Sequence, residues 1–399
     1  MSLSILNTKS TKGKYTFEIK SDIENPLEKS FVNAIRRTIL TDIPTVGISQ
    51  SDVYIEKNET SLHNEFMKHR ISMIPLNIDP ISYKDDYLFT LNVENKTDKI
   101  RVVTTNDFKI YPLKKENIGK SDLSFDKENY DEIEIPEKLK KKILKPYEIE
   151  GITSYIIVTE LKPKTSDEEY QHINFWFSPR IGTGKENASF NNIPQCSYSY
   201  HENSGLLNKA ISDEIKLKAI SKKMEQQKLQ KEFTNAYRQR YFHRTSDNEP
   251  YWYNFVVKSN HYYKSKKIFE YSIEILIDIL NRCSENFKLI NIDPEKSRYS
   301  AKILENKSIE FILNQENDTV GNILQSHISN NVTDSTLISF CGYKKIHPLE
   351  EKIKLILCHK QIDDIDDTSV ISKIVFSIIE NIDEIINILE SLLEQSKKV

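Results

Sequence analysis

The sequence predicts an α+β protein whose two similar halves pack against each other through helices. An order of strand, helix, strand and helix occurs in the N-terminal part and again in the C-terminal part. Each half ends in a helix with one apolar face, which is poorly stable unless it packs against another surface. A stretch with several short strand patterns interrupts the first half. We therefore expect the helices of the two halves to be each other's partners.

Length and composition agree with a globular protein of several units. The chain has 399 residues, of which 38% are hydrophobic and 29% charged. This length is enough for two or three compact units. The formal net charge is −3, so only local patches, and not the whole surface, are expected to attract nucleic acid. No apolar run is long enough to span a membrane, and no signal peptide is recognisable, so we expect no membrane partner.

The cysteines do not have the spacing of a metal site. Cys196, Cys283, Cys341 and Cys358 are far apart, and no Cys-x-x-Cys pair is present. Because zinc sites need closely spaced ligand pairs, we expect neither a metal nor another cofactor. Isolated thiols indicate a reducing, intracellular compartment.

The first half begins with a strand and an amphipathic helix. Residues 14–19 alternate between polar and apolar side chains, as in a half-buried strand. Asn25 is predicted to cap the following helix, with Glu28 completing a capping box. The apolar face of this helix contains Leu27, Phe31, Ala34, Ile35 and Ile39. A second helix with an apolar face is predicted over residues 266–283.

The second half repeats this pattern. Residues 308–313 and 353–357 alternate as strands, and a helix capped by Asp318 or Thr319 lies between them. Leu324 belongs to the apolar face of that helix. A long helix is predicted from residue 369 to the tail, and its apolar stripe includes Ile382 and Leu389.

Several motifs resemble those of a known family. Residues 33–40 read Asn-Ala-Ile-Arg-Arg-Thr-Ile-Leu, and residues 62–71 and 74–76 supply a His/Glu/Arg segment closed by Ile-Pro-Leu. This order resembles the assembly subunit of multisubunit RNA polymerases, namely the third-largest eukaryotic subunit, its archaeal D-type counterpart and, more distantly, bacterial alpha. Residues 319–324, 340–343 and 347–350 resemble its small partner, which is the eleventh class in eukaryotes and the L-type in archaea.

The resemblance implies a fusion of two subunits, joined near residues 292–296. It implies a first dimerisation domain over 1–45 and 175–290, an inserted β-rich domain over 46–174, and a second dimerisation domain over 291–399, packed as a pseudo-dimer. Many relatives carry a zinc-binding cysteine cluster in the insert, and this sequence has none there. Similar fusions resemble those of large cytoplasmic DNA viruses, which would place the protein in the host cytoplasm and the virion.

The resemblance also implies a scaffold without catalytic residues. The family holds the two largest polymerase subunits together, and small zinc-bearing subunits are possible further partners near the loop at 182–188. DNA or RNA would be contacted only indirectly. The implied interface residues are Phe31, Asn33, Ile35, Arg36, Arg37, Ile39, His63, Glu65, His69, Arg70, Gly184, Lys185, Gly321, Asn322, Leu324, Tyr343, His347, Ile382 and Leu389. The first half would face the second-largest subunit, and the second half the largest.

Three alternatives follow from the residues themselves. The charged segment at 206–243 is predicted to form an extended helical arm or a pair of helices. A free-standing nucleic-acid-binding protein could use the basic run at 138–145 and residues 216–240 of this segment. A homodimerising transcription adaptor would use the same helices between chains. An enzyme is disfavoured, because the acidic run at 363–367 has no general base or phosphate clamp nearby in the sequence. His63 and His69 would lie on different helix faces, which disfavours a shared metal.

Overall fold

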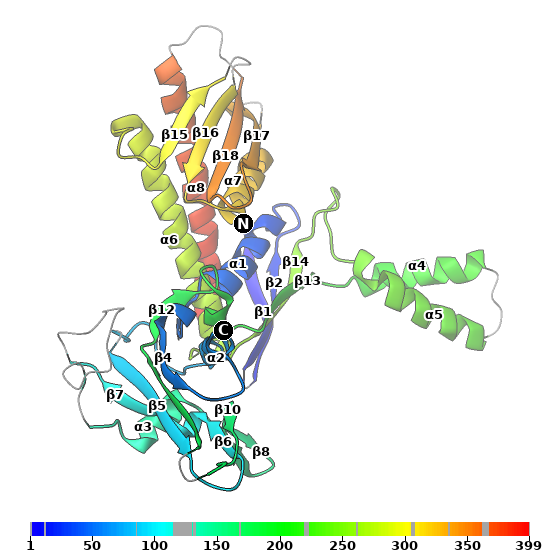
Figure 1. The fold of residues 1–399 in the computed structure, drawn as a ribbon. Coiled ribbons are helices and arrows are strands. Elements are labelled where there is room, and N and C mark those ends of the chain that lie inside the picture. Colours follow the sequence, from blue (N-terminus) through cyan, green and yellow to red (C-terminus); the bar gives the residue numbers. More distant parts are fainter. Residues whose placement is uncertain are drawn as a thin grey trace. The chain divides into compact units, whose positions relative to one another are not determined.

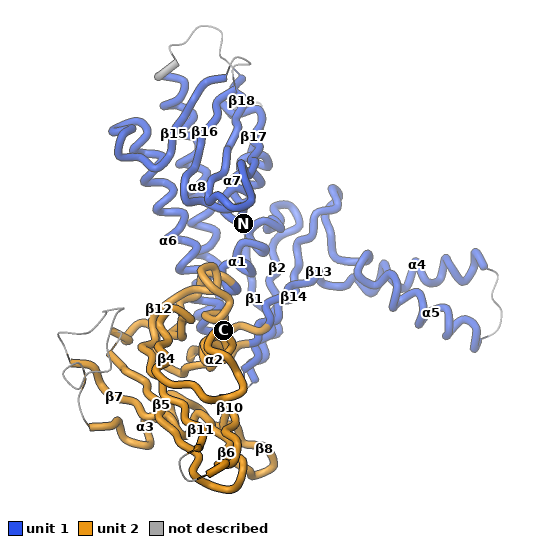
Figure 2. The backbone as a smooth tube through the Cα atoms, viewed as in Figure 1, with its two compact units in different colours: residues 1–40, 195–258, 265–399 blue, residues 41–194, 259–264 orange. Residues whose placement is uncertain are grey.

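The computed structural model describes residues 2–398 except for 12, 85, 115–129, 131–132, 167–168, 219–222, 261, 305–307, 334–335 and 361–366. The acidic run at 363–366 therefore lies outside the described residues. The chain forms two compact units, which are coloured separately in Figure 2. The first comprises residues 1–40, 195–258 and 265–399, and the second comprises 41–194 and 259–264. Both contain helices and sheets, so the predicted α+β class is confirmed.

The first unit contains two four-stranded antiparallel sheets of the same topology (Figure 1). The first sheet has the order β1-β2-β14-β13, and the second has the order β15-β16-β18-β17. In each sheet, two antiparallel strand pairs meet through the second strand of each pair: β2 lies beside β14, and β16 lies beside β18. The strands are β1 (Leu3–Thr11), β2 (Lys14–Ser21), β13 (Gln195–Tyr200), β14 (Trp252–Lys258), β15 (Tyr299–Ile303), β16 (Ser308–Asn314), β17 (Ile338–Lys345) and β18 (Lys352–His359).

Each sheet also has one short and one long helix at equivalent places in the chain. The short helices, α1 (Lys29–Thr41) and α7 (Asp318–Asn330), follow the second strand of their sheets. The long helices, α6 (Ser265–Ile292) and α8 (Asp367–Lys398), follow the last strand. Helix α6 continues nine residues beyond the predicted end at Cys283, because Phe287 packs against the aromatic residues of the second sheet.

The predicted start of the first helix is wrong. Asn25 does not cap it, since α1 begins at Lys29. The preceding residues are held outside the helix by the sheet: the Leu27 N–H donates to Ser21 Oγ (2.8 Å), and the Tyr253 hydroxyl donates to the Leu27 carbonyl (2.8 Å). The side chain of Glu28 bonds Ser30 and a distant histidine instead of completing a capping box.

The segment between β13 and β14 is a pair of helices, α4 (Ser204–Leu217) and α5 (Lys223–Tyr237), which we call the arm (Figure 1). The Asn203 side chain caps α4 by accepting from the Leu206 N–H (3.1 Å). The two segments that lead into and out of the arm are hydrogen-bonded to each other: the Asn203 N–H donates to the Tyr241 carbonyl (2.9 Å). Leu207 and Ile211 of α4 are buried, whereas α5 has no buried residue.

The second unit is built around a four-stranded antiparallel sheet with the order β4-β11-β5-β7. The described residues of this unit also form the strand pairs β3–β12, β6–β10 and β8–β9, the α-helices α2 and α3, and short 3-10 turns. Its core is rich in phenylalanine, with Phe89, Phe175 and Phe177 fully buried. The elements are β3 (Pro44–Gly47), β4 (Val53–Asn58), α2 (Asn64–Ser72), β5 (Tyr87–Asn95), β6 (Arg101–Thr104), β7 (Lys109–Pro112), α3 (Glu137–Ile143), β8 (Tyr147–Ile149), β9 (Ile152–Ser154), β10 (Ile157–Leu161), β11 (Gln171–Phe177) and β12 (Arg180–Thr183).

Candidate subunit interfaces

The two long helices of the first unit pack along each other in opposite directions. Glu270, near the start of α6, accepts from Ser396 near the end of α8 (3.4 Å). At the other end, Asn291 of α6 accepts from Ser372 of α8 (3.3 Å). Between these polar ends, Ile382 and Leu389 are fully buried, as their apolar spacing predicts. The antiparallel pair thus buries the apolar stripe that neither helix could cover alone.

Helix α6 connects the cores of both sheets. Near its start, the ring of Phe269 lies 4.4 Å from that of Phe17 in the first sheet. Near its end, the ring of Phe287 lies 5.0 Å from Tyr299 and 5.7 Å from Phe311 in the second sheet. Aromatic pairs at these separations add to the stabilisation from buried area. The first half therefore contributes one end of its own helix to the core of the second half.

A buried polar cluster joins the residue before α1 to α7 and α8. His327 of α7, which is 5% exposed, bonds Glu28 through Nδ1 (3.1 Å) and Glu384 of α8 through Nε2 (3.2 Å). Burial raises the pKa of Glu28, but hydrogen bonds with His327, Ser326 and Ser30 and the electrostatic interaction with His327 outweigh it and leave this pKa below its usual value. The ring of Phe31 meets the His327 ring edge-on at 5.8 Å.

Arg37 forms a second contact between the short helices. Its Nε donates to Thr319 Oγ1 at 2.8 Å, so this member of the double arginine bonds inside the chain. Thr319 lies in the first turn of α7, and Gly321 follows it. A Cβ atom on Gly321 would lie 2.6 Å from Cδ2 of Tyr343, so only glycine allows α7 to approach β17 this closely. Gly321 and Tyr343 are thus packing partners within the second half.

The other predicted interface residues of α1 and α7 divide into buried and accessible ones. Ile35, Ile39 and Leu324 are fully buried in the first unit. Asn33, Arg36 and Asn322 are partly buried. The guanidinium of Arg36 donates to Asn33 Oδ1 through Nε (3.2 Å) and Nη2 (2.8 Å), which fixes its orientation on the helix. Arg36 and Asn33 therefore bond each other, whereas Arg37, which is equally partly buried, bonds Thr319 of α7.

The predicted His/Glu/Arg segment at 62–71 forms most of α2 in the second unit. His63 precedes the helix, and Glu65, His69 and Arg70 lie in it with exposed side chains. Arg70 donates to the carbonyls of Val158 and Ile157 (both 3.0 Å), so it anchors α2 to β10. The three other side chains remain accessible to a partner.

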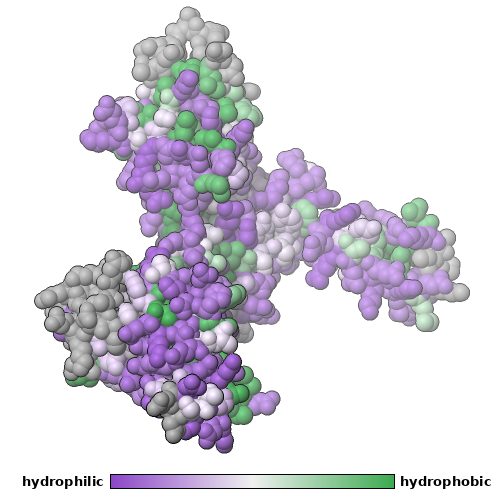
Figure 3. Space-filling view, viewed as in Figure 1, coloured by the Kyte–Doolittle hydropathy of each residue, from purple (hydrophilic) through white to green (hydrophobic). Residues whose placement is uncertain are grey.

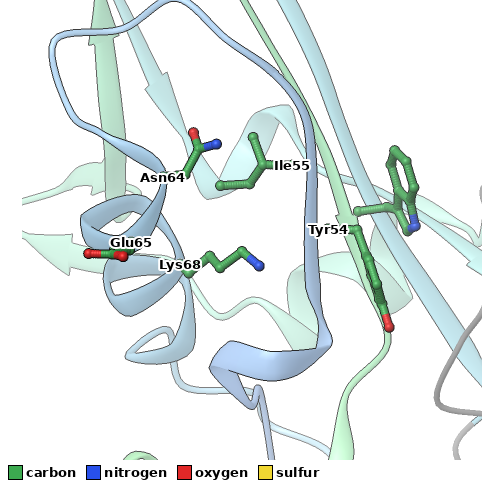
Figure 4. Close-up of a pocket in the computed structure, with 6 residues that line it drawn as sticks. Tyr54, Ile55, Asn64, Glu65 and Lys68 are labelled. Carbon is green, nitrogen blue, oxygen red and sulfur yellow. The ribbon is translucent and has the colours of Figure 1, made fainter.

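A shallow hollow of about 460 Å³ lies beside α2. In Figure 4 the side chain of Lys68 extends from α2 towards Tyr54, whereas that of Glu65 points away from it. The Tyr54 and Trp176 rings stack at 6.1 Å on the neighbouring strands β4 and β11. The hollow is lined by Tyr54, Ile55, Asn64, Glu65, Lys68 and Trp176.

The predicted loop at 182–188 connects β12 to a short helical turn. The Lys185 N–H donates to the Thr41 carbonyl (2.8 Å), and the Lys185 side chain is exposed. Gly184 lies beside it and is partly buried. In the second half, His347 is exposed after β17, and its Nδ1 accepts from the Leu349 N–H (3.2 Å). The loop and His347 are in different units.

The described residues contain no group of three or more His, Cys, Asp or Glu side chains that could hold a metal ion. None of the helices, as far as they are described, is long and apolar enough to cross a membrane. All four cysteines are free thiols. Burial raises the pKa of Cys196 and of Cys341 to about 12, so these thiols stay protonated and unreactive at neutral pH.

The sequence patterns miss the residues that connect the halves through polar contacts. They do not single out His327, and they assign Glu28 and Thr319 to local helix caps, although Asn317 caps α7. One signal is present: His327 lies three and four residues after Leu324 and Ile323, on the apolar face of its helix. A histidine on an apolar face is expected to have a buried partner, but the sequence does not identify that partner.

Comparison with known proteins agrees with this geometry. Models of the RNA polymerase Rpb3/Rpb11 dimerisation domain match residues 23–280 and, separately, residues 308–394. The chain is 36% identical over 81 residues to the DNA-directed RNA polymerase subunit Rpo3 of Methanocaldococcus jannaschii, covering 20% of this chain and 38% of the relative. It is 38% identical over 71 residues to the Pyrococcus furiosus Rpo3, covering 16% and 26%.

A eukaryotic relative is matched over a similar length. The subunit rpac1 of RNA polymerases I and III from Dictyostelium discoideum is 31% identical over 85 residues, covering 18% of this chain and 24% of the relative. In each of these three cases the match spans well under half of the relative's length. The first family model, in contrast, spans more than half of this chain. The chain therefore belongs to the RNA polymerase Rpb3/Rpb11 dimerisation-domain family.

Proposed function

We propose that this chain is a non-catalytic assembly subunit of a DNA-dependent RNA polymerase, in which two subunits made separately elsewhere are joined end to end. The observation that carries the proposal is the double match to one dimerisation family in a single chain. Each matched part includes strands of one of the two sheets of equal topology and most of one helix of the antiparallel α6/α8 pair. A covalent link raises the effective concentration of the second half and removes competition from other partners.

The pseudo-dimer would then nucleate association of the two largest polymerase subunits. In the first half, the Asn33–Arg36 pair presents a guanidinium already fixed by a neighbouring amide. Such a fork suits a carboxylate or carbonyl on a partner surface. In the second unit, His63, Glu65 and His69 are exposed on or beside α2. We assign the second-largest subunit to these surfaces and the largest subunit to the second half, including Asn322 and His347. Lys185 and Gly184 would face small zinc-bearing subunits.

The direct test is purification of the chain, tagged at its N-terminus, under native conditions, followed by mass spectrometry. We expect two large polymerase subunits in equal amounts. Recovery of the chain alone, or with nucleic acid only, would contradict the proposal. Arg36→Ala should lower the recovery of the large subunits without changing the unfolding transition, because Arg36 bonds only Asn33 among the described hydrogen bonds and ion pairs. Lys209→Ala, on the exposed surface of α4, is the matched control.

The homodimer alternative makes a different prediction. In the described chain the stripe of α8 is already covered by α6, and residues such as Leu389 have no exposed surface to offer a second copy. We therefore expect sedimentation to report a monomer over a wide range of concentrations. The free thiols agree with a reducing compartment, and we propose that the protein acts inside cells, or in the host cytoplasm and virion if the fusion is viral.

A further inference from the structure

The arm is a basic element in an acidic chain. Residues 204–237 contain seven lysines against four acidic residues, a net charge of +3, whereas the whole chain has a net charge of −3. Three of the four acids pair with lysines of their own helix: Asp213 with Lys216 (3.6 Å), Glu214 with Lys218 (2.9 Å) and Glu232 with Lys228 (4.0 Å). The excess positive charge is therefore held by the remaining basic side chains.

The three lysines of α5, Lys223, Lys228 and Lys231, lie on one face of the helix. At about 100° per residue, seven residues of α5 fall within an arc of about 140°. Thr234 is partly buried, the other six are exposed, and none of the seven is acidic. We call the six exposed residues the lysine face, which consists of Lys223, Met224, Gln227, Lys228, Lys231 and Asn235. The acidic residues of α5, Glu225 and Glu232, lie outside the lysine face. Figure 3 shows hydrophilic side chains over much of the arm.

The side chains of the lysine face are available to a ligand. Within the described part of the chain, Lys223 and Lys231 have no ion-pair partner, and Lys228 has only a long contact to Glu232. The face carries ammonium groups together with amide side chains, which donate hydrogen bonds and, like lysine, commonly contact phosphate oxygens. Because α5 has no buried residue, packing within the chain does not explain why these lysines lie on one face.

We propose that the lysine face of α5 binds the phosphate backbone of duplex DNA without sequence specificity. A single helix fits beside or into the major groove of a duplex, where lysines reach phosphates on both sides. A single strand is a poorer ligand, because binding it requires aromatic side chains on which bases can stack. The aromatic residues of the arm, Phe233 and Tyr237, lie off the lysine face and stack on each other at 4.8 Å.

The choice of DNA over RNA rests on the proposed role in a DNA-dependent polymerase, whereas the preference for a duplex rests on the face itself. The binding test uses the isolated full chain and requires no polymerase. Its failure would therefore leave the assembly function intact, and loss of the assembly function would leave the duplex site testable.

The experiment measures fluorescence anisotropy of a labelled DNA duplex of random sequence with the full chain, between about 50 and 200 mM KCl. Three phosphate contacts imply a slope of log K against log salt of about −2.7, so affinity should fall about 40-fold across this range. The triple variant K223Q/K228Q/K231Q should lose this salt-dependent binding. Its circular dichroism should remain unchanged, because all three side chains are exposed.

The matched control is K138Q/K141Q/K142Q, which removes the same charge from exposed positions of α3 in the second unit. It should bind the duplex as the wild type does. The proposal is overturned if the wild type does not bind, if the α5 variant binds equally well, or if only the α3 variant loses binding. Equal binding of a single strand or of duplex RNA would overturn the duplex or the DNA assignment. Equal binding of polyglutamate would make the face a site for an acidic protein instead.

Discussion

The two pairs of helices join the halves of the first unit by different physical means. Helices α6 and α8 bury an apolar stripe, and their polar contacts are confined to the ends of the pair. Helix α1, with the residue before it, and helix α7 instead meet through two polar contacts, the Glu28–His327 and the Arg37–Thr319 hydrogen bonds. Apolar burial is strong and non-directional, whereas a buried polar contact is satisfied in only one geometry.

This difference suggests a division of roles. We expect the long helices to supply most of the free energy that holds the halves together. We expect the short helices to fix their register, because His327 must meet two carboxylates at once, one just before α1 and one in α8. Breaking a buried polar contact leaves its partner unsatisfied, so the polar region should still be sensitive to mutation. The four predictions below test this division in order of decreasing effect.

Leu389→Asp should have the largest effect. The side chain of Leu389 is fully buried in the long-helix pair, and a carboxylate there would have no partner. We expect a loss of about 4 kcal/mol or more in the free energy of unfolding, or failure to fold. Soluble yield and urea unfolding measure this loss. Leu217→Asp, at a position that is 80% exposed, is the control and should behave as the wild type. Unchanged unfolding of Leu389→Asp would mean that the long helices do not hold the halves together.

His327→Ala should cost less but still be clearly measurable. It leaves the Glu28 carboxylate, whose side chain is 13% exposed, without its main partner. We expect a loss of about 2–3 kcal/mol in the free energy of unfolding. His347→Ala removes an exposed histidine of the same half and should change stability by less than about 0.5 kcal/mol. Similar effects for both variants would remove the polar cluster from the interface.

The sequence predicted the apolar region of this interface better than the polar one. Ile382 and Leu389 recur at helical spacing, and periodicity alone identifies a buried face. Glu28 and His327 are 299 positions apart, and neither lies in a sequence pattern that identifies the other as its partner. Glu28 also fits a local capping box, so propensity favoured a local role. Instead, the hydrogen bond from the Leu27 N–H to Ser21 Oγ holds this segment against the sheet and outside the helix. Such tertiary contacts cannot be predicted from the local sequence.

The same reason limits the prediction of element ends and accessible residues. The apolar spacing around Ile275 and Leu280 predicted α6, but its last turns depend on Phe287 meeting the second sheet. Arg36 and Arg37 are adjacent and look equivalent in the sequence, yet only Arg37 bonds Thr319. Which side of a helix faces a distant partner depends on the packing of the whole unit. The interface residues therefore remain predictions at the positions where no contact within the chain tests them.

Arg37 and Thr319 allow the polar contact to be measured by itself. The hydrogen bond between them, at 2.8 Å, should contribute about 1 kcal/mol to the free energy of unfolding. We expect Arg37→Ala and Thr319→Val to be coupled by about that amount in a double-mutant cycle followed by urea unfolding. The cycle of Arg36→Ala with Thr319→Val is the control and should show no coupling, since Arg36 bonds Asn33 instead. Equal coupling in both cycles would show that the effect is not specific to the bond.

The smallest effect is the pH dependence that Glu28 contributes. Its pKa in the folded protein lies below the value of 4.5 expected for the unfolded chain, because the hydrogen bonds of His327, Ser326 and Ser30 outweigh the effect of burial. Above pH 4.5 the carboxylate is charged in both states, and its stabilising contribution is complete. Below that pH the unfolded chain takes up the proton first. The contribution therefore decreases and is lost as pH falls through the folded pKa.

Glu28→Gln isolates this contribution, because glutamine keeps the size of the side chain and does not titrate. Urea unfolding of both proteins between about pH 6 and pH 3 should give curves that differ by a constant amount above pH 4.5 and converge below it. Glu384→Gln is the matched control, since Glu384 bonds the other ring nitrogen of His327 but its side chain is 60% exposed. A difference between wild type and Glu28→Gln that grows as pH falls would reverse the sign. Glu28 would then be destabilised as a carboxylate, and the polar region would oppose the association that the apolar helices favour.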